Sequence, residues 1–285
     1  MKFLITGVNG QLGYDVKREL FLRGYDKIYA PSREELDITN EEEVSNYLLK
    51  FQPNVVIHCA AYTAVDKAED DKENCYNVNV NGTKYLVDSS KKVNAKFIYI
   101  STDYVFDGTK DGCYLPSDIT CPINYYGETK LLGEKIVQEY DNHIIVRISW
   151  VFGINGNNFI KTMLRLAETR KELGVVCDQI GSPTYTEDLS KLLVDMSLSD
   201  KIGIYHATNE GFCSWNEFAK WIFEVNDISC QVNPVLTKDY KTIAIRPLNS
   251  RLDKTKLVDD GFDRLPNWKD AVKRYCKVLK KEGNK

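Results

Sequence analysis

The sequence of 285 residues contains no apolar run that approaches the roughly 20 residues needed by a membrane-spanning helix. The first six residues carry one positive charge and a short apolar run, 3–5, without the longer apolar region and cleavage site of a secretory signal. This opening is typical of a first β-strand. We therefore expect neither a membrane span nor an export signal.

The cysteines and histidines lack the spacings that bind metal ions or form redox pairs. No two of the eight cysteines lie three positions apart, and the three histidines, His58, His143 and His206, share no ligand spacing. These residues therefore predict no metal site. Scattered cysteines without an export signal are typical of reduced thiols, which favours a cytoplasmic location.

An excess of basic residues is also absent, since 38 lysines and arginines face 41 aspartates and glutamates, for a formal net charge of −3. A nucleic-acid-binding surface favours a basic balance, so we expect no nucleic-acid partner. The 43% hydrophobic and 28% charged residues are ordinary for a globular protein. The length accommodates one large domain or two unequal ones.

Within residues 1–150, short apolar runs alternate with amphipathic segments at helical spacing. This alternation predicts right-handed crossovers and a parallel sheet. We therefore predict an α/β fold with a Rossmann-type, doubly wound parallel sheet. The expected strands are 3–5, 27–30, 55–60, 97–100 and 144–148, and the expected helices are 11–23, 41–51, 74–92 and 127–140.

Beyond Trp150 the alternation is less regular, and four prolines interrupt the chain. We interpret 151–285 as mainly a smaller C-terminal lobe that binds substrate, with some segments returning to the first domain. The helices expected in this part of the chain are 159–170, 186–197, 214–225 and 267–281.

A glycine-rich turn with the spacing G-x-x-G-x-x-G joins the first strand to the first helix. Its first glycine permits a tight turn, the second lets the backbone approach a pyrophosphate, and the third lets helix pack on strand. The helix start adds free N–H groups and a positive dipole end. An ordinary turn is the alternative, but the strand–turn–helix context favours a dinucleotide, so 1–150 is predicted to bind NAD(P). The predicted contacts are Gly7, Gly10, Gln11, Leu12 and Gly13.

The end of the second strand should lie near the adenosine ribose of the dinucleotide. An acidic residue there would bind the 2′-hydroxyl of NAD, but the chain has Arg33, which could instead contact the 2′-phosphate of NADPH. A solvated loop arginine is the alternative, so both NADPH and NADH stay open as cofactors. Asp37 and Ile38 follow, where they could flank the adenine.

A Y-x-x-x-K pair, Tyr126 and Lys130, begins the helix that follows the fourth strand. Residues four apart share a helix face. We expect the ammonium, together with the charge of an oxidised nicotinamide, to lower the phenol pKa from about 10 towards neutrality, where tyrosine can donate a proton. A surface pair is the alternative, but strand ends at this edge face the ligand.

Two polar residues, Thr102 and Asp103, follow the fourth strand at the same edge. The Thr102 hydroxyl could bond a substrate carbonyl oxygen and orient the Tyr126 proton. A turn or helix cap is the alternative function for both residues. Trp150 lies just past the fifth strand, also at the carboxyl edge, where it is a candidate ligand contact rather than a core residue.

These segments follow one another in an order that resembles the dTDP-4-dehydrorhamnose reductases, which are extended short-chain dehydrogenase/reductases. The similarity extends over nearly the whole chain, and the A-A-Y-T-A-V-D-K-A-E and S-T-D-Y-V-F blocks are far more specific than the glycine turn. The segments that resemble the family are 6–13, 60–69, 79–83, 101–106, 126–130, 149–152, 157–159, 178–184 and 246–250.

The resemblance implies reduction of dTDP-4-dehydro-β-L-rhamnose to dTDP-β-L-rhamnose, with hydride passing from nicotinamide C4 to sugar C4. It implies that Tyr126 protonates the developing alkoxide and that Lys130 also holds the nicotinamide ribose. Thr102 and Asp103 would contact the sugar, and Trp150 would cover it. The cofactor would pass along Ala60, Ala61 and Tyr62, although family members often have histidine at the last position.

The resemblance also implies features that the residues alone do not predict. Some family members bind Mg²⁺ at a dimer interface, and Glu187 stands at one matching position, although no full ligand set is present and a solvated helix glutamate is the alternative. A homodimer is implied in the same way. Gln179 is a further candidate for contact with the sugar or nucleotide.

Two other functions remain open from the sequence. The first is another enzyme on the same scaffold, such as a 4-reductase for a different deoxysugar, an epimerase or a dehydratase. Asp103 is the one acid beside Thr102, which weakens the dehydratase because that elimination uses added acidic residues. The second is a non-catalytic dinucleotide-binding subunit like the regulatory subunit of methionine adenosyltransferase, which the intact tyrosine, lysine and threonine disfavour.

Overall fold

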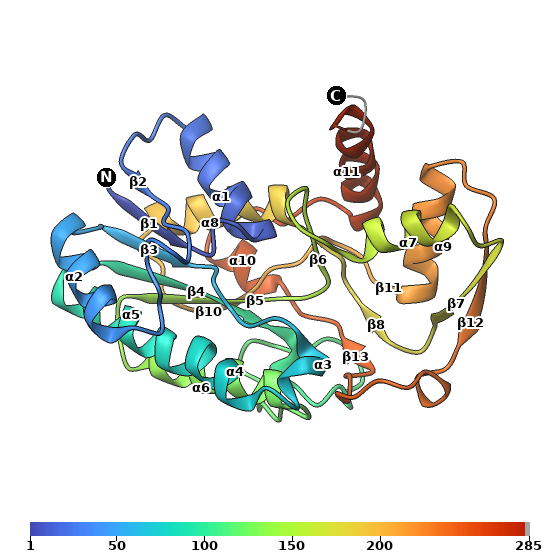
Figure 1. Cartoon of the computed structure of the whole chain (residues 1–285), viewed down its shortest axis with the longest axis horizontal. Helices are drawn as coiled ribbons and strands as arrows, with labels where there is room; N and C mark the ends of the chain where they lie inside the picture. The colour runs from blue at the N-terminus through green and yellow to red at the C-terminus, as the bar shows by residue number, and fades with distance from the viewer. Residues whose placement is uncertain (283–285) are drawn as a thin grey trace.

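A sheet of six parallel strands forms the centre of the protein, whose computed structural model describes residues 1–282 (Figure 1). The strand order is β10-β5-β4-β3-β1-β2, and every neighbouring pair is parallel. The order reverses between β1 and β3, so the sheet has a switch point there. The strands are β1 (Phe3–Thr6), β2 (Ile28–Tyr29), β3 (Val55–His58), β4 (Lys96–Thr102), β5 (His143–Ile148) and β10 (Gly203–His206).

Helices cover both faces of this sheet, which confirms the predicted α/β fold with a doubly wound, Rossmann-type sheet (Figure 1). The strands are apolar on both faces. Phe3 and Ile5 pack with α1 and α8, whereas Leu4 packs with α2 and α5 on the opposite face. The helices around the sheet are α1 (Gln11–Leu22), α2 (Glu41–Phe51), α3 (Val65–Ala68), α4 (Lys72–Tyr76), α5 (Gly82–Lys92), α6 (Tyr125–Gln138), α8 (Thr186–Leu198) and α10 (Thr255–Asp259), with a 3₁₀ turn η2 (Asp103–Val105).

A second lobe beside the carboxyl ends of the strands has an aromatic core of its own (Figure 1). Phe152, Tyr185, Phe218 and Tyr275 are buried in that core. Its helices are α7 (Phe159–Ala167), α9 (Trp215–Val225) and α11 (Trp268–Glu282), with the 3₁₀ turn η3 (Thr237–Asp239). Two strand pairs are β6 (Val151–Phe152) with β9 (Thr184–Tyr185) and β7 (Glu172–Val176) with β12 (Gln231–Val235). A three-stranded sheet has the order β11 (Cys213–Ser214), β8 (Ile180–Gly181) and β13 (Asn249–Ser250).

Two features of the fold differ from the sequence prediction. The segment expected as one helix at 74–92 is instead α4 and α5 joined by a π-helical turn, η1 (Asn77–Asn81). The sheet also gains β10, which pairs with β5 although no strand was predicted there. β10 has only two consecutive apolar residues, Ile204 and Tyr205, between Gly203 and His206, so it lacks an apolar run long enough to mark a strand. The boundary at residue 150 stays a prediction, since β10 and α8 belong to the sheet layer.

No helix within residues 1–282 is long and apolar enough to cross a membrane. All eight cysteines are free thiols.

Candidate active site

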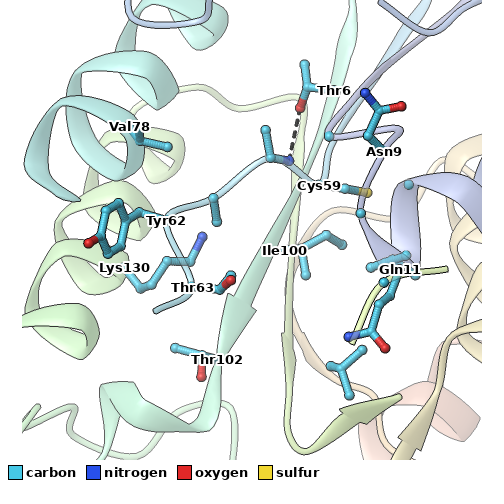
Figure 2. Close-up of a pocket in the computed structure, with 18 of the residues that line it drawn as sticks. Thr6, Asn9, Gln11, Cys59, Tyr62, Thr63, Val78, Ile100, Thr102 and Lys130 are labelled. Atoms are coloured by element: carbon cyan, nitrogen blue, oxygen red, sulfur yellow. Dashed lines mark hydrogen bonds between the residues drawn. The ribbon is translucent and has the colours of Figure 1, made fainter. Parts of the chain in front are cut away.

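A cleft of about 700 Å³ lies at the carboxyl edge of the sheet, beside the switch point and between the two lobes. It extends from the glycine-rich turn to the start of α6, and Figure 2 shows its lining. The residues predicted for the catalytic and cofactor sites all line this one cleft, together with three of the residues predicted to contact the sugar. They are Gly7, Gly10, Gln11, Leu12, Gly13, Arg33, Asp37, Ile38, Ala60, Ala61, Tyr62, Thr102, Asp103, Tyr126, Lys130 and Trp150.

The glycines of the turn are required by close packing. Gly7 has a positive φ of 71°, and a Cβ there would lie 2.6 Å from the backbone nitrogen of Ala60. A Cβ on Gly13 would lie 2.3 Å from the Gly7 carbonyl oxygen. Helix α1 begins after Gly10 without a side-chain cap, so its first N–H groups stay available for an anion at the cleft.

A buried chain of hydrogen bonds fixes the end of β3 beside this turn. The Thr6 hydroxyl bonds His58 Nδ1 at 2.7 Å and accepts a bond from the backbone N–H of Ala60 at 3.2 Å, the dashed line in Figure 2. His58 Nε2 lies 3.2 Å from the Thr83 hydroxyl. Burial, with the nearby charge of Lys130, lowers the pKa of His58 to about 3, so this histidine is a neutral structural group.

Asn79, in the π-helical turn, holds the next residues of the cleft wall. Its Oδ1 accepts from the Tyr62 N–H at 2.8 Å, and its Nδ2 donates to the Tyr62 carbonyl at 3.2 Å and to Thr129 Oγ1 at 3.0 Å. No motif assigned Asn79 a role, although it begins the segment 79–83 that resembles the family. The position of Asn79 opposite Ala60–Tyr62 depends on η1, which the helical pattern did not reveal.

Helix α6 brings Tyr126 close to the polar segment that follows β4. Asn124 caps the helix by accepting from the Gly127 N–H at 2.8 Å. Gly127 permits the approach, because a Cβ there would lie 2.2 Å from the Tyr104 carbonyl oxygen. The ring of Tyr104 meets that of Tyr126 edge-on at 5.7 Å. The tyrosine that should donate a proton therefore lies over the end of β4.

Lys130 lies one helical turn beyond Tyr126, and both side chains are buried, at 2% and 9% exposure. Its ammonium lies 4.0 Å from the centroid of the Tyr99 ring. Figure 2 shows the side chain extending from α6 into the cleft, towards Thr63. Burial lowers the pKa of Lys130 to about 7, and the charge of Glu134 opposes that shift.

The lowered pKa expected for Tyr126 beside the charge of an oxidised nicotinamide stays a prediction. In the chain itself, burial raises the pKa of this phenol above the ordinary value and the carboxylate of Asp103 adds to this, while Thr102 acts in the opposite direction. At neutral pH Tyr126 therefore retains its proton, the form a proton donor needs.

Thr102 and Asp103 form one hydrogen-bonded unit below this helix. The Thr102 hydroxyl donates to Asp103 Oδ1 at 3.0 Å and accepts from the Tyr104 N–H at 3.2 Å, so it also caps η2. Asp103 Oδ2 is buried without a hydrogen-bond partner in the described part of the chain. Burial raises the pKa of Asp103 to about 6, although Ser250 and Thr102 act in the opposite direction. A buried carboxylate with free acceptor capacity suits a ligand hydroxyl.

Trp150 has a positive φ of 48°, which is unfavourable for a bulky residue. Its indole stacks on that of Trp215, with ring centroids 3.7 Å apart and planes at 14°. This strained position at the junction of the lobes places the indole in the lining of the cleft.

The residues expected at the adenosine end lie together at the opposite end of the cleft. Arg33 is exposed and forms no salt bridge in the described part of the chain. Asp37 Oδ1 accepts bonds from the Thr39 N–H and hydroxyl at 3.0 and 2.8 Å, which lower the pKa of its carboxyl. Ile38 is buried against Gly82, where a Cβ would lie 3.1 Å from its Cδ1.

Two candidates for other contacts lie outside the cleft lining. Gln179 donates to the Thr237 hydroxyl at 3.1 Å within the second lobe. Glu187 accepts from the Tyr185 hydroxyl at 2.9 Å and pairs with Lys191 at 3.4 Å. No group of three or more histidines, cysteines or carboxylates within residues 1–282 is arranged to hold a metal ion. The Mg²⁺ that the resemblance implied would bind at an interface between two subunits, so it stays a prediction.

Comparisons with known proteins agree with this geometry. Residues 1–281 match the family described as the RmlD substrate binding domain. A dTDP-4-dehydrorhamnose reductase of Aggregatibacter actinomycetemcomitans is 43% identical over 95% of this chain and 97% of its own, and that of Escherichia coli K12 is 38% identical over 98% of each. The structure of a dTDP-4-dehydrorhamnose reductase from Bacillus anthracis in complex with NADP superposes with a TM-score of 0.94 at 42% identity, covering 98% of this chain and 100% of that one. The predicted resemblance is confirmed, and this chain belongs to the dTDP-4-dehydrorhamnose reductase family.

Proposed function

We propose that this protein reduces the 4-keto group of dTDP-4-dehydro-β-L-rhamnose to give dTDP-β-L-rhamnose, with NADPH or NADH as the reductant. The observation that carries the proposal is the meeting of Tyr126, Lys130 and Thr102 in the same cleft as the glycine-rich turn. A proton donor and a dinucleotide-binding turn in one cleft are what reduction of a carbonyl by hydride requires.

The cleft fits a dinucleotide at the turn and at the wall opposite it. The uncapped N-terminus of α1 and the glycine backbone would hold the pyrophosphate, and the backbone of Ala60–Tyr62 would border the rest of the cofactor. Lys130 would hold the nicotinamide ribose. When bound, the reduced cofactor supplies the hydride for C4 of the sugar.

The protein side of the reaction is a proton transfer. Tyr126, protonated because its pKa is raised, would donate its proton to the oxygen on C4. The Thr102 hydroxyl would bond the same oxygen and align it with the phenol. The Lys130 ammonium would then stabilise the tyrosinate until solvent returns a proton.

The sugar would lie between Asp103 and Trp150. The carboxylate has an unused acceptor oxygen for a sugar hydroxyl, and the indole offers an apolar face that excludes water from the reacting carbonyl. The nucleotide would extend towards the second lobe. The proposal includes a homodimer, which the family resemblance supports, and a cytoplasmic location, which the free thiols support.

The names of the similar proteins favour this keto-sugar over other substrates of the same scaffold, and the complete set of Tyr126, Lys130 and Thr102 disfavours a regulatory subunit without activity. The test is the loss of reduced-nicotinamide absorbance when the protein is mixed with NADPH and the dTDP-linked 4-keto sugar. Tyr126→Phe should lower kcat by about 10²- to 10⁴-fold while NADPH still binds. If the variant turns over substrate as fast as the unaltered protein, Tyr126 is not the acid. If the unaltered protein reduces no keto-sugar, the proposed reaction is refuted.

A further inference from the structure

A buried ion pair, Glu134 with Arg147, lies directly behind the proposed proton-transfer residues. Arg147 Nε donates to Glu134 Oε1 at 2.9 Å and Nη2 donates to Oε2 at 2.7 Å, so the pair is bidentate. The two side chains are 1% and 3% exposed. The Ser101 hydroxyl donates to the same Oε1 at 2.5 Å. Three hydrogen bonds to charged or hydroxyl donors fix the position of this carboxylate.

The elements that this carboxylate joins are those that bear the site. Glu134 lies on α6 one turn beyond Lys130 and two turns beyond Tyr126, so the three share one helix face. Ser101 precedes Thr102 at the end of β4 and is the register partner of Arg147 on β5. One side chain therefore ties the helix of the proton donor to the strand end that bears Thr102.

Arg147 makes further contacts around the pair. The guanidinium of Arg147 lies 5.0 Å from the centroid of the Phe106 ring, and its Nη1 donates to the Pro116 carbonyl oxygen at 3.2 Å. His206, 3.4 Å from Nη1, has its pKa lowered to about 3 by burial and by Arg147, so it is neutral. Ion pairs this deeply buried add little net stability over apolar residues of equal size, so their position in a fold calls for another reason.

We propose that Glu134, held by Arg147 and Ser101, is a positioning residue that fixes Tyr126 and Lys130 on α6 relative to Thr102 on β4. The inference rests on the proposed function. It assigns Glu134 no contact with substrate or cofactor, since it lies outside the cleft lining.

The same carboxylate has a second, electrostatic effect on Lys130. Burial lowers the pKa of Lys130 to about 7, and the charge of Glu134 raises it, as do Cys59 and Cys75. The other groups facing the ammonium are the neutral His58 on β3 and the Tyr99 ring on β4. Removal of the Glu134 charge should therefore lower the pKa of Lys130 further, and less of it would be an ammonium at neutral pH.

Glu134→Gln tests this, because glutamine keeps the shape and an acceptor but loses the charge. The measurement is the pH dependence of kcat/KM for keto-sugar reduction. We expect the alkaline limb to move to lower pH by about one unit, so that kcat/KM at pH 8 falls about tenfold. Asp188→Asn is the matched control. Asp188 is a buried carboxylate on α8 that pairs with Arg274 at 2.6 Å, and it lies outside the cleft lining. Its pH profile should stay that of the unaltered protein.

A second variant guards against misfolding, since glutamine leaves Arg147 without a counter-ion. Glu134→Leu combined with Arg147→Met removes both charges at similar volume and should also move the alkaline limb of the kcat/KM profile to lower pH.

The pH dependence of NADPH affinity is a second readout, which needs no keto-sugar and is followed by NADPH fluorescence. It should shift to lower pH in the same variants. If the unaltered protein binds NADPH but reduces no keto-sugar, the proposed function fails while this readout still tests Glu134. Unshifted profiles in both variants would show that the pair is only structural.

Discussion

Gly181 makes room for the indole of Trp150. A Cβ on Gly181 would lie 2.7 Å from Trp150 Cε2, closer than side chains approach one another. The indole also stacks on Trp215. The glycine in β8 and the tryptophan after β5 thus fix the orientation of an aromatic ring that lines the cleft, although 31 positions separate them in the sequence.

Gly181→Ala should therefore displace the indole and weaken sugar binding. We expect KM for the sugar nucleotide to rise about tenfold, equivalent to about 1.4 kcal/mol, while KM for NADPH changes little. Steady-state kinetics with each substrate varied in turn measures both. Gly174→Ala in β7 is the control, since the new methyl meets Val235 at 2.9 Å away from the cleft. Equal losses for sugar and cofactor would mean that the indole does not face the sugar.

Arg33→Ala should weaken NADPH more than NADH. The exposed guanidinium lies at the adenosine end of the cleft, where it would bind a 2′-phosphate that NADH lacks. We expect the Kd for NADPH to rise about tenfold at low salt, with a smaller change at high salt because the contact is exposed. Fluorescence titration of each cofactor measures this, with the exposed Arg165→Ala on α7 as the control. Equal losses for the two cofactors would remove Arg33 from phosphate recognition.

The sequence predicted most of the site because strand ends and local motifs determine where those residues lie. The glycine-rich turn, the tyrosine–lysine pair and the polar residues after β4 each follow a strand of a parallel sheet, so one topology places them at one edge. The fold followed from the same alternation, and the helix at Glu41–Phe51 has the predicted bounds.

The residues that support the site could not be predicted in the same way. The bonds of Asn79 to Tyr62 and of Glu134 to Arg147 join segments 13 or more positions apart, and no periodic pattern specifies such partners. The rise in the pKa of Tyr126 also has no local signal, since its main cause is burial by the fold. β10 was missed because it has only two consecutive apolar residues, Ile204 and Tyr205, whereas β1 and β3 have three each.

Asn79→Ala should reduce both stability and cofactor affinity. The substitution leaves the N–H and carbonyl of Tyr62 without their side-chain partners, and unmet bonds of buried groups cost about 1–3 kcal/mol each. We expect the free energy of unfolding to fall by about 2 kcal/mol and NADPH to bind more weakly, because Ala60–Tyr62 line the cleft. Urea unfolding and NADPH titration measure the two effects. Asn226→Ala, which removes a bond to Ile222 in α9, should lower stability without changing NADPH affinity.

Asp103→Asn should stabilise the protein at neutral pH while reducing its activity. The folded-state pKa of Asp103 is raised to about 6 from an ordinary 3.8, so the folded protein binds this proton more tightly than the unfolded chain does. The resulting stability is present below the unfolded pKa and is lost as pH rises through about 6. Asparagine stays neutral throughout, so the variant avoids that loss at higher pH.

The advantage of the Asp103→Asn variant should therefore widen by about 2 kcal/mol between pH 4.5 and pH 7.5. Urea unfolding of both proteins at the two pH values measures it. Asp107→Asn is the control of opposite sign, because bonds from Thr109 and Tyr114 lower the pKa of Asp107 and its stability is lost as pH falls. At pH 7.5 the Asp103 variant should also reduce keto-sugar about tenfold more slowly, since an amide is a weaker acceptor than a carboxylate. The prediction is contradicted if the difference in stability between the variant and the unaltered protein is constant or narrows towards pH 7.5. That result would also contradict the inference that the buried, ionised Asp103 lowers stability and is retained in the cleft to bind a ligand.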